Sequence, residues 1–251
     1  IQGHLYADLS MKDSKQYGEG WCWDDKNPVL TPLLVGGKDI FMARFLDALT
    51  SHGVYVDATI DEKRKPIDAF CIVNRFHTID QILMRMLKES NNLYAEAMYY
   101  QIAASTGNHP ASAKSARNVE RRLVDKIGLD ASRYKFADGS GLSLYNYVSA
   151  ELEVKMLRYA YKNDNIRHHL MPALPIAGVD GTLKKRMKGT FTRDNVKAKT
   201  GTVTGISSLA GYCQAANGHT LCFAIINQGV MHGRNGRAFQ DRVCNTLCAP
   251  N

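Results

Sequence analysis

The chain has 251 residues, and 45% of them are hydrophobic, which is enough apolar material for a substantial core. Its formal net charge of +8 would suit nucleic acid, an anionic envelope polymer or a membrane surface. The densest basic clusters, 63–65 and 184–186, are short and typical of solvated faces, so we assign no nucleic-acid partner and leave peripheral membrane association open. No segment approaches the ~20 apolar residues that span a bilayer. We expect a soluble chain with any export signal outside it.

The first half of the chain is predicted to begin with a strand and continue mainly as helices. In order, we expect a strand at 5–9, an aromatic-rich turn at 18–25, a helix at 40–49, a strand at 54–56, and helices at 79–88, 93–105 and 111–127. Asp39 and Thr78 are expected to cap the helices that follow them, because short polar side chains accept the free N–H groups of a first turn.

The second half combines a shaped loop, further helices and strands. We expect a tight loop at 136–143, a helix at 149–162 capped by Ser149, one or two helical turns within 174–186, strands and a hairpin over 195–226, and a helix at 237–247. The fold class is therefore α/β of the α+β type, in which strands near both ends share one antiparallel sheet covered by helices. We treat residues 1–251 as a single domain.

Six cysteines without a Cys-x-x-Cys pair give no metal or redox signature, so we assign no metal and no cofactor. A two-residue turn at 217–218 would place Cys213 directly opposite Cys222, where a cross-strand disulfide is geometrically possible. Two buried thiols in a core strand are the alternative, and the sequence leaves both interpretations open. Cys244 and Cys248, spaced i and i+4 on a helix, are expected to be core contacts.

Two short polar patterns suggest a binding site. Lys199-Thr200-Gly201 puts an ammonium and a hydroxyl on a strand, where the glycine lets a substrate backbone approach and the cation can meet a carboxylate. A sheet edge of this kind can bind an extended peptide by strand addition. A turn with a surface lysine is the alternative. Ser90 and Asn92 lie between two predicted helices, where they can project from the junction or cap the second helix.

Several segments, taken together and in order, resemble a known family. They are 90–96 (S-N-N-L-Y-A-E), 138–143 (D-G-S-G-L-S), 174–183 (L-P-I-A-G-V-D-G-T-L) and 199–202 (K-T-G-T), with the tryptophan turn at 20–25 also similar. They resemble the D-alanyl-D-alanine carboxypeptidase/endopeptidase family, the class C penicillin-binding proteins. The resemblance implies a penicillin-recognising, β-lactamase/transpeptidase-like fold and an exported enzyme of the periplasm or cell envelope. It implies peptidoglycan stem peptides and β-lactams as ligands.

The resemblance also implies roles for individual residues. Ser90 would relay a proton to the leaving amine, Asn92 would hold the substrate amide, and Lys199 would bind the terminal carboxylate with Thr200. The backbone N–H of Thr202 would supply half of an oxyanion hole. The implied catalytic residues are Ser90, Asn92 and Lys199, and the implied substrate-binding residues are Thr200, Gly201, Thr202, Asp138 and Ser140.

The sequence departs from the family pattern at the nucleophile. The family requires a Ser-x-x-Lys before the Ser-x-Asn, but the only such pattern in this chain, Ser132 to Lys135, follows Ser90, and we interpret it as a chance match. The nucleophile is expected upstream of Ile1 or has been lost. Between Asp25 and Lys38 a short Pro-containing connection stands where the family has long insert domains, and both a compact natural variant and a chain given without those segments stay open. The hypotheses are a D-Ala-D-Ala carboxypeptidase/endopeptidase, a non-catalytic peptidoglycan-binding or scaffold domain, and a β-lactamase.

Overall fold

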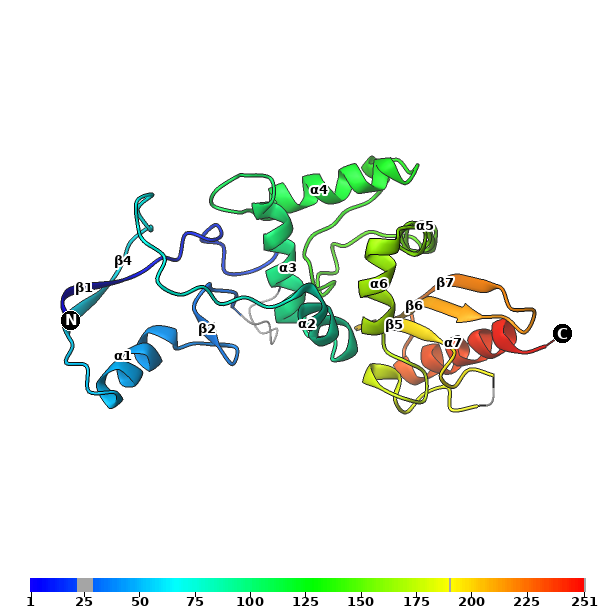
Figure 1. Ribbon diagram of the computed structural model, residues 1–251. Helices are drawn as coiled ribbons and strands as arrows, with labels where there is room; N and C mark the ends of the chain where they lie inside the picture. The colour runs from blue at the N-terminus through cyan, green and yellow to red at the C-terminus, as the bar shows by residue number, and fades with distance from the viewer. Residues whose placement is uncertain (22–28, 190, 251) are drawn as a thin grey trace.

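The computed structural model describes residues 1–21, 29–189 and 191–250. Figure 1 shows the N-terminal elements at one end of the molecule, a three-stranded sheet at the other, and helices between them. None of the helices in these ranges is both long and apolar enough to cross a membrane. The expected aromatic-rich turn at 18–25 falls partly outside the described residues, as does the connection from Asp25 to Lys38.

The N-terminal part is built around two parallel strands. It contains β1 (Gln2–Ala7), β2 (Leu34–Val35), β3 (Lys38–Asp39), α1 (Phe41–Ser51) and β4 (Asp57–Glu62). β1 pairs with β4 in parallel, because α1 lies in the crossover between them and returns the chain in the same direction. The expectation that strands from both ends share one antiparallel sheet is therefore wrong. Two local expectations also fail. The strand expected at 54–56 begins instead at Asp57, as β4, and the N-cap of α1 is Ile40, not Asp39.

Helices dominate the middle of the chain, as the sequence predicts. They are α2 (Ile79–Leu83), a π-helix (Met84–Lys88), α3 (Asn92–Ala104), α4 (Ala113–Lys126) and a 3-10 turn (Ala131–Arg133). Thr78 caps α2 through a full capping box with Gln81, which confirms the cap read from the sequence.

The C-terminal part is a helix–sheet–helix sandwich. Its elements are α5 (Ala150–Lys162), α6 (Asp164–Ala173), a 3-10 turn (Gly181–Leu183), β5 (Lys197–Val203), β6 (Ile206–Gln214), β7 (Thr220–Gln228) and α7 (Gly233–Cys248). The antiparallel order is β5-β6-β7. Side chains from both faces of this sheet contact helices: Leu209 and Phe223 belong to the core that includes α7, while the Tyr212 hydroxyl donates to Leu157 O of α5 at 2.7 Å. Ser149 caps α5 as predicted.

The β6–β7 hairpin corrects the predicted cysteine pairing. Ala215 N donates to His219 O at 2.9 Å, so three residues, not two, form the loop, and Gly218 takes the left-handed conformation with φ +83°. The extra residue shifts the register by one position, which pairs Cys213 with Leu221 instead of Cys222. A one-residue shift sends a side chain to the opposite face of the sheet. Cys213 and Cys222 therefore lie on opposite faces of the sheet, which excludes a disulfide between them.

Candidate active site

Ser90 occupies a strained junction between two helices. The residues before it form a π-helix, a rare conformation often found at functional sites, and Ser90 itself has φ +54°. Asn91, not Ser90 or Asn92, caps α3, because its side chain accepts the Tyr94 N–H at 3.3 Å. The capping interaction therefore leaves the side chains of Ser90 and Asn92 available for another role.

Lys199 on β5 reaches Ser90 across the molecule. Its ammonium donates to Ser90 Oγ at 2.7 Å and to the Thr200 carbonyl oxygen at 2.7 Å. Burial lowers the pKa of Lys199 to about 8, because desolvation disfavours the charged amine. The structure thus brings together two residues that the sequence singled out 109 positions apart.

The loop at 174–183 forms a third side of this site. Lys88 Nζ lies 2.6 Å from Asp180 Oδ2, and the other carboxylate oxygen of Asp180 accepts the Ile176 N–H at 2.8 Å. Thr200 Oγ1 donates to Thr182 Oγ1 at 3.0 Å. The loop therefore links the segment that carries Ser90 to the strand that carries Lys199.

Gly181 shows how closely these segments pack. A Cβ atom at this position would lie 2.9 Å from the backbone oxygen of Lys88, and φ is +55°. Sequence reasoning assigned no role to Lys88, Asp180 or Thr182. The last two lie in a segment noted only for its resemblance, while Lys88 carries no pattern that distinguishes it from a surface lysine.

The outer edge of β5 is open beyond its first residues. Ala198 N donates to Pro175 O and Ala177 N donates to Val196 O, each at 2.9 Å, so these backbone groups of Val196 and Ala198 point away from β6. Because outward-pointing groups recur every second residue, the N–H groups of Thr200 and Thr202 point to the same edge. In the described ranges no strand covers β5 on this side, which leaves an edge suited to strand addition.

Gly201 has a structural reason to be glycine. It pairs with Ser208 on β6, and a Cβ atom at Gly201 would collide with the Ser208 hydroxyl. This obstacle comes from the neighbouring strand, and a rotation of the Ser208 side chain would relieve it, because the Ser208 Cβ would lie 3.7 Å away. The side chain of Thr202, the next residue, is exposed.

The Asp138 loop is shaped by its own hydrogen bonds. The buried Asp138 carboxylate accepts the Trp21 indole N–H at 2.7 Å, the Ser143 N–H at 2.7 Å, and the Gly141 N–H and the Asn146 amide at 2.8 Å each. Four donors fill the acceptor positions of a carboxylate. Such saturation favours an organising role for Asp138, and its substrate contact stays a prediction.

Glu96 of α3 binds the backbone of the same loop. Its Oε1 accepts the Gly139 N–H at 3.1 Å and the Ser140 N–H at 2.7 Å, while burial raises the pKa of Glu96. The Ser140 hydroxyl is buried and has no hydrogen-bond partner among the described residues. No hydrogen bond in the described ranges links the loop to Lys199. A substrate role for Ser140 likewise stays a prediction.

Ser132 lies outside the site. It is exposed on the 3-10 turn, and its N–H donates to Asp130 Oδ1 at 2.9 Å. Lys135 is engaged elsewhere, with its ammonium 2.7 Å from Glu19 Oε1. These contacts agree with the interpretation of Ser132-x-x-Lys135 as a chance match.

Comparison with known proteins identifies what this arrangement resembles. The model of the D-Ala-D-Ala carboxypeptidase 3 (S13) family matches residues 35–247. The chain is 33% identical over 235 residues to the D-alanyl-D-alanine carboxypeptidase DacB of Haemophilus influenzae, an alignment that covers 92% of this chain and 49% of that protein. The chain therefore spans about half the length of this curated relative.

Solved structures give the same picture at the level of the fold. Penicillin binding protein 4 (dacB) from Haemophilus influenzae superposes with a TM-score of 0.83 at 22% identity, covering 99% of this chain and 75% of that one. A second structure of that protein, in complex with a β-lactam, gives a TM-score of 0.73 at 27% identity, with coverage of 84% and 50%. The predicted penicillin-recognising fold is confirmed.

Proposed function

The chain belongs to the D-Ala-D-Ala carboxypeptidase 3 (S13) family, and from this premise we propose that it forms the substrate-docking wall of a serine-type D-Ala-D-Ala carboxypeptidase/endopeptidase. The substrate is a peptidoglycan stem peptide, and β-lactams bind at the same place as its mimics. Such an enzyme works in the periplasm or cell envelope. The observation that carries the proposal is the 2.7 Å contact between Lys199 Nζ and Ser90 Oγ, beside the open edge of β5.

In the proposed reaction, a serine nucleophile attacks the carbonyl between the two D-alanines and forms an acyl-enzyme that water resolves. The substrate lies along the open edge of β5, where the Thr202 N–H donates to the oxygen that becomes negative. The Asn92 side chain holds the substrate amide. The terminal carboxylate meets Lys199, whose pKa of about 8 keeps the amine largely protonated at pH 7, and the hydroxyl of Thr200.

Ser90 transfers the proton from the attacking hydroxyl to the leaving amine in this reaction. Its hydroxyl accepts a hydrogen bond from Lys199, which orients its own proton away from the lysine. That proton can pass to the leaving amine as the C–N bond breaks, while Ser90 regains one from the attacking hydroxyl. The strained backbone of Ser90, with φ +54°, holds the hydroxyl at the helix junction where this relay is possible.

We assign the nucleophile to a Ser-x-x-Lys outside residues 1–251, since Ser132 is exposed and Lys135 is paired with Glu19. A fluorescent penicillin tests this. The protein at its natural length should form a covalent adduct, the Ser132→Ala variant should label equally, and the 251-residue chain alone should not label.

Absence of an adduct on the natural-length protein, under conditions that label a control enzyme, would sink the hydrolase proposal and favour a non-catalytic peptidoglycan-binding domain. An adduct mapped to Ser132 would instead move the nucleophile into this chain. Rapid turnover of the adduct would favour a β-lactamase, while a long-lived adduct supports the carboxypeptidase.

A further inference from the structure

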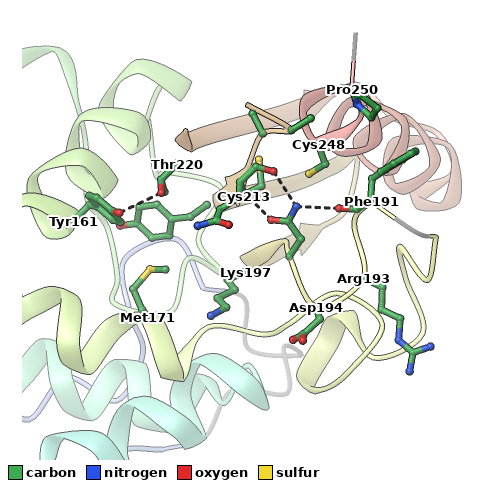
Figure 2. A pocket seen from close by; sticks show the side chains of 15 residues that line it. Tyr161, Met171, Phe191, Arg193, Asp194, Lys197, Cys213, Thr220, Cys248 and Pro250 are labelled. Atoms are coloured by element: carbon green, nitrogen blue, oxygen red, sulfur yellow. Dashed lines mark hydrogen bonds between the residues drawn. The ribbon is translucent and has the colours of Figure 1, made fainter. Parts of the chain in front are cut away.

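A cavity of about 750 Å³ opens at the end of the three-stranded sheet, away from Ser90 and Lys199. Its wall includes Tyr161 and Tyr212, and also the thiols of Cys213 on β6 and Cys248 on α7. Figure 2 shows both cysteine side chains on this wall. The proposed catalytic function uses neither residue, so a separate explanation is needed for two thiols that face one cavity.

The two cysteines are close neighbours in the core. Both belong to the cluster that joins the sheet to α7, where Cys213 is 2% and Cys248 is 4% exposed. Cys222, the partner expected from the sequence, points to the opposite face, where its sulfur contacts Val154 O of α5 at 3.9 Å.

From this geometry we propose that Cys213 and Cys248 form a disulfide that fastens the end of the C-terminal helix to the middle strand of the sheet. The bond would close a loop of 35 residues that contains β7 and nearly all of α7 (248 − 213 = 35). Disulfides form and persist in oxidising compartments, which include the periplasm. Closing such a loop removes conformational freedom from the unfolded chain and thereby stabilises the fold.

Cys248 is the thiol expected to react first. It lies in the last turn of α7, followed by Ala249 and Pro250, and helix ends fray more readily than helix centres. Burial raises the pKa of both thiols, so fraying of this helix end is the motion that brings Cys248 to an oxidant.

The step is a thiol–disulfide exchange with a small or protein disulfide as oxidant. The Cys248 thiolate attacks one sulfur of the donor R–S–S–R, which releases RS⁻ and leaves Cys248 in a mixed disulfide. The Cys213 thiolate then attacks the Cys248 sulfur and displaces the second RS⁻. Two protein thiols lose two electrons and two protons, and one donor disulfide becomes two thiols.

The experiment maps the cysteines of the natural-length protein after exposure to oxidised glutathione, both as the folded protein and during refolding. Exposed Cys71 can form a mixed disulfide with glutathione, so the decisive readout is a Cys213–Cys248 peptide in non-reducing mass spectrometry, which we expect to find. Oxidation should raise the Tm by about 5–10 °C, as expected for a loop of this size in a chain of this length.

Three single variants serve as controls. Cys244→Ala should still give the Cys213–Cys248 peptide, because Cys244 does not line the cavity. Cys213→Ala and Cys248→Ala should each give no cross-linked peptide containing the remaining partner and show no rise in Tm. If either fails to fold, the peptide map of the unmodified chain decides. The proposal is overturned if Cys213 and Cys248 both stay free in both treatments, if Cys244 is the bonded partner, or if a glutathione adduct persists on Cys213 or Cys248 without a cross-link.

Discussion

Replacing Lys199 with alanine removes the charged partner that we assign to the substrate carboxylate. Hydrogen bonds between ionised groups contribute about twice as much as neutral ones, so we expect a loss of about 2–4 kcal/mol in transition-state binding. This corresponds to a fall in kcat/KM of about 30- to 1,000-fold. The assay is the release of D-alanine from a D-Ala-D-Ala peptide by the natural-length protein.

The chain offers a matched control and a matched substrate. Lys197 lies two residues away on the same face of β5 but lines the distal cavity, so Lys197→Ala should change kcat/KM less than about threefold. A peptide whose terminal carboxylate is amidated should react slowly with the unmodified enzyme and equally slowly with Lys199→Ala. Equal losses on both peptides would refute the carboxylate role and leave Lys199 as a structural support for Ser90.

Three further predictions follow from the same contacts. Because the pKa of Lys199 is about 8, KM for the carboxylate peptide should rise as the pH increases through 8. Between pH 8 and the ordinary lysine pKa of 10.5, the unfolded state binds more protons than the folded state. Stability to urea should therefore rise with pH in this range, an effect absent in Lys199→Met. Asp180→Asn removes the charged partner of the Lys88 ammonium, whose side chain is 11% exposed. The free energy of unfolding in urea should fall by about 1–3 kcal/mol, and penicillin acylation should slow. Unchanged acylation would show that the ion pair does not position Ser90. Gly201→Ala should cost about 1 kcal/mol, because the Ser208 side chain must leave its rotamer, and Ser208→Ala in the same chain should restore most of that loss; without such rescue the assigned clash is wrong.

Local chemistry made several parts of the fold readable from the sequence. Thr78 and Ser149 cap their helices as expected, because a helix start needs an acceptor for its free N–H groups and these side chains supply one. Cys244 and Cys248 are buried core contacts, which follows from their i, i+4 spacing on an apolar face. Such features depend on a few neighbouring residues, and the sequence displays those directly.

Features set by distant pairing were not readable. The strand at 2–7 could have joined any sheet, and only the position of α1 between β1 and β4 makes their pairing parallel. The Asn217-Gly218 turn suggested a two-residue loop, but the loop has three residues, and this reversed the face of Cys213. The α6 helix was missed because its sequence contains two histidines and Pro172, which weaken the helical signal, while contact with α2 supports it.

The candidate site falls between these cases. Resemblance of short segments singled out Ser90 and Lys199, and the structure places their polar atoms 2.7 Å apart. The supporting contact between Lys88 and Asp180 left no trace in the sequence, since an ion pair between segments 92 residues apart has no local pattern. Sequence reasoning therefore found the groups proposed to meet the substrate, and missed the ion pair that holds their segments together.

The most direct test of the account is the structure of the natural-length protein acylated by a penicillin. We predict that the β-lactam carboxylate lies within hydrogen-bonding distance of Lys199 Nζ or Thr200 Oγ1, and that the acyl carbonyl oxygen accepts the Thr202 N–H. An acyl group bound away from β5, or a carboxylate with no contact to either side chain, would contradict the assignment of this strand as the substrate-docking wall.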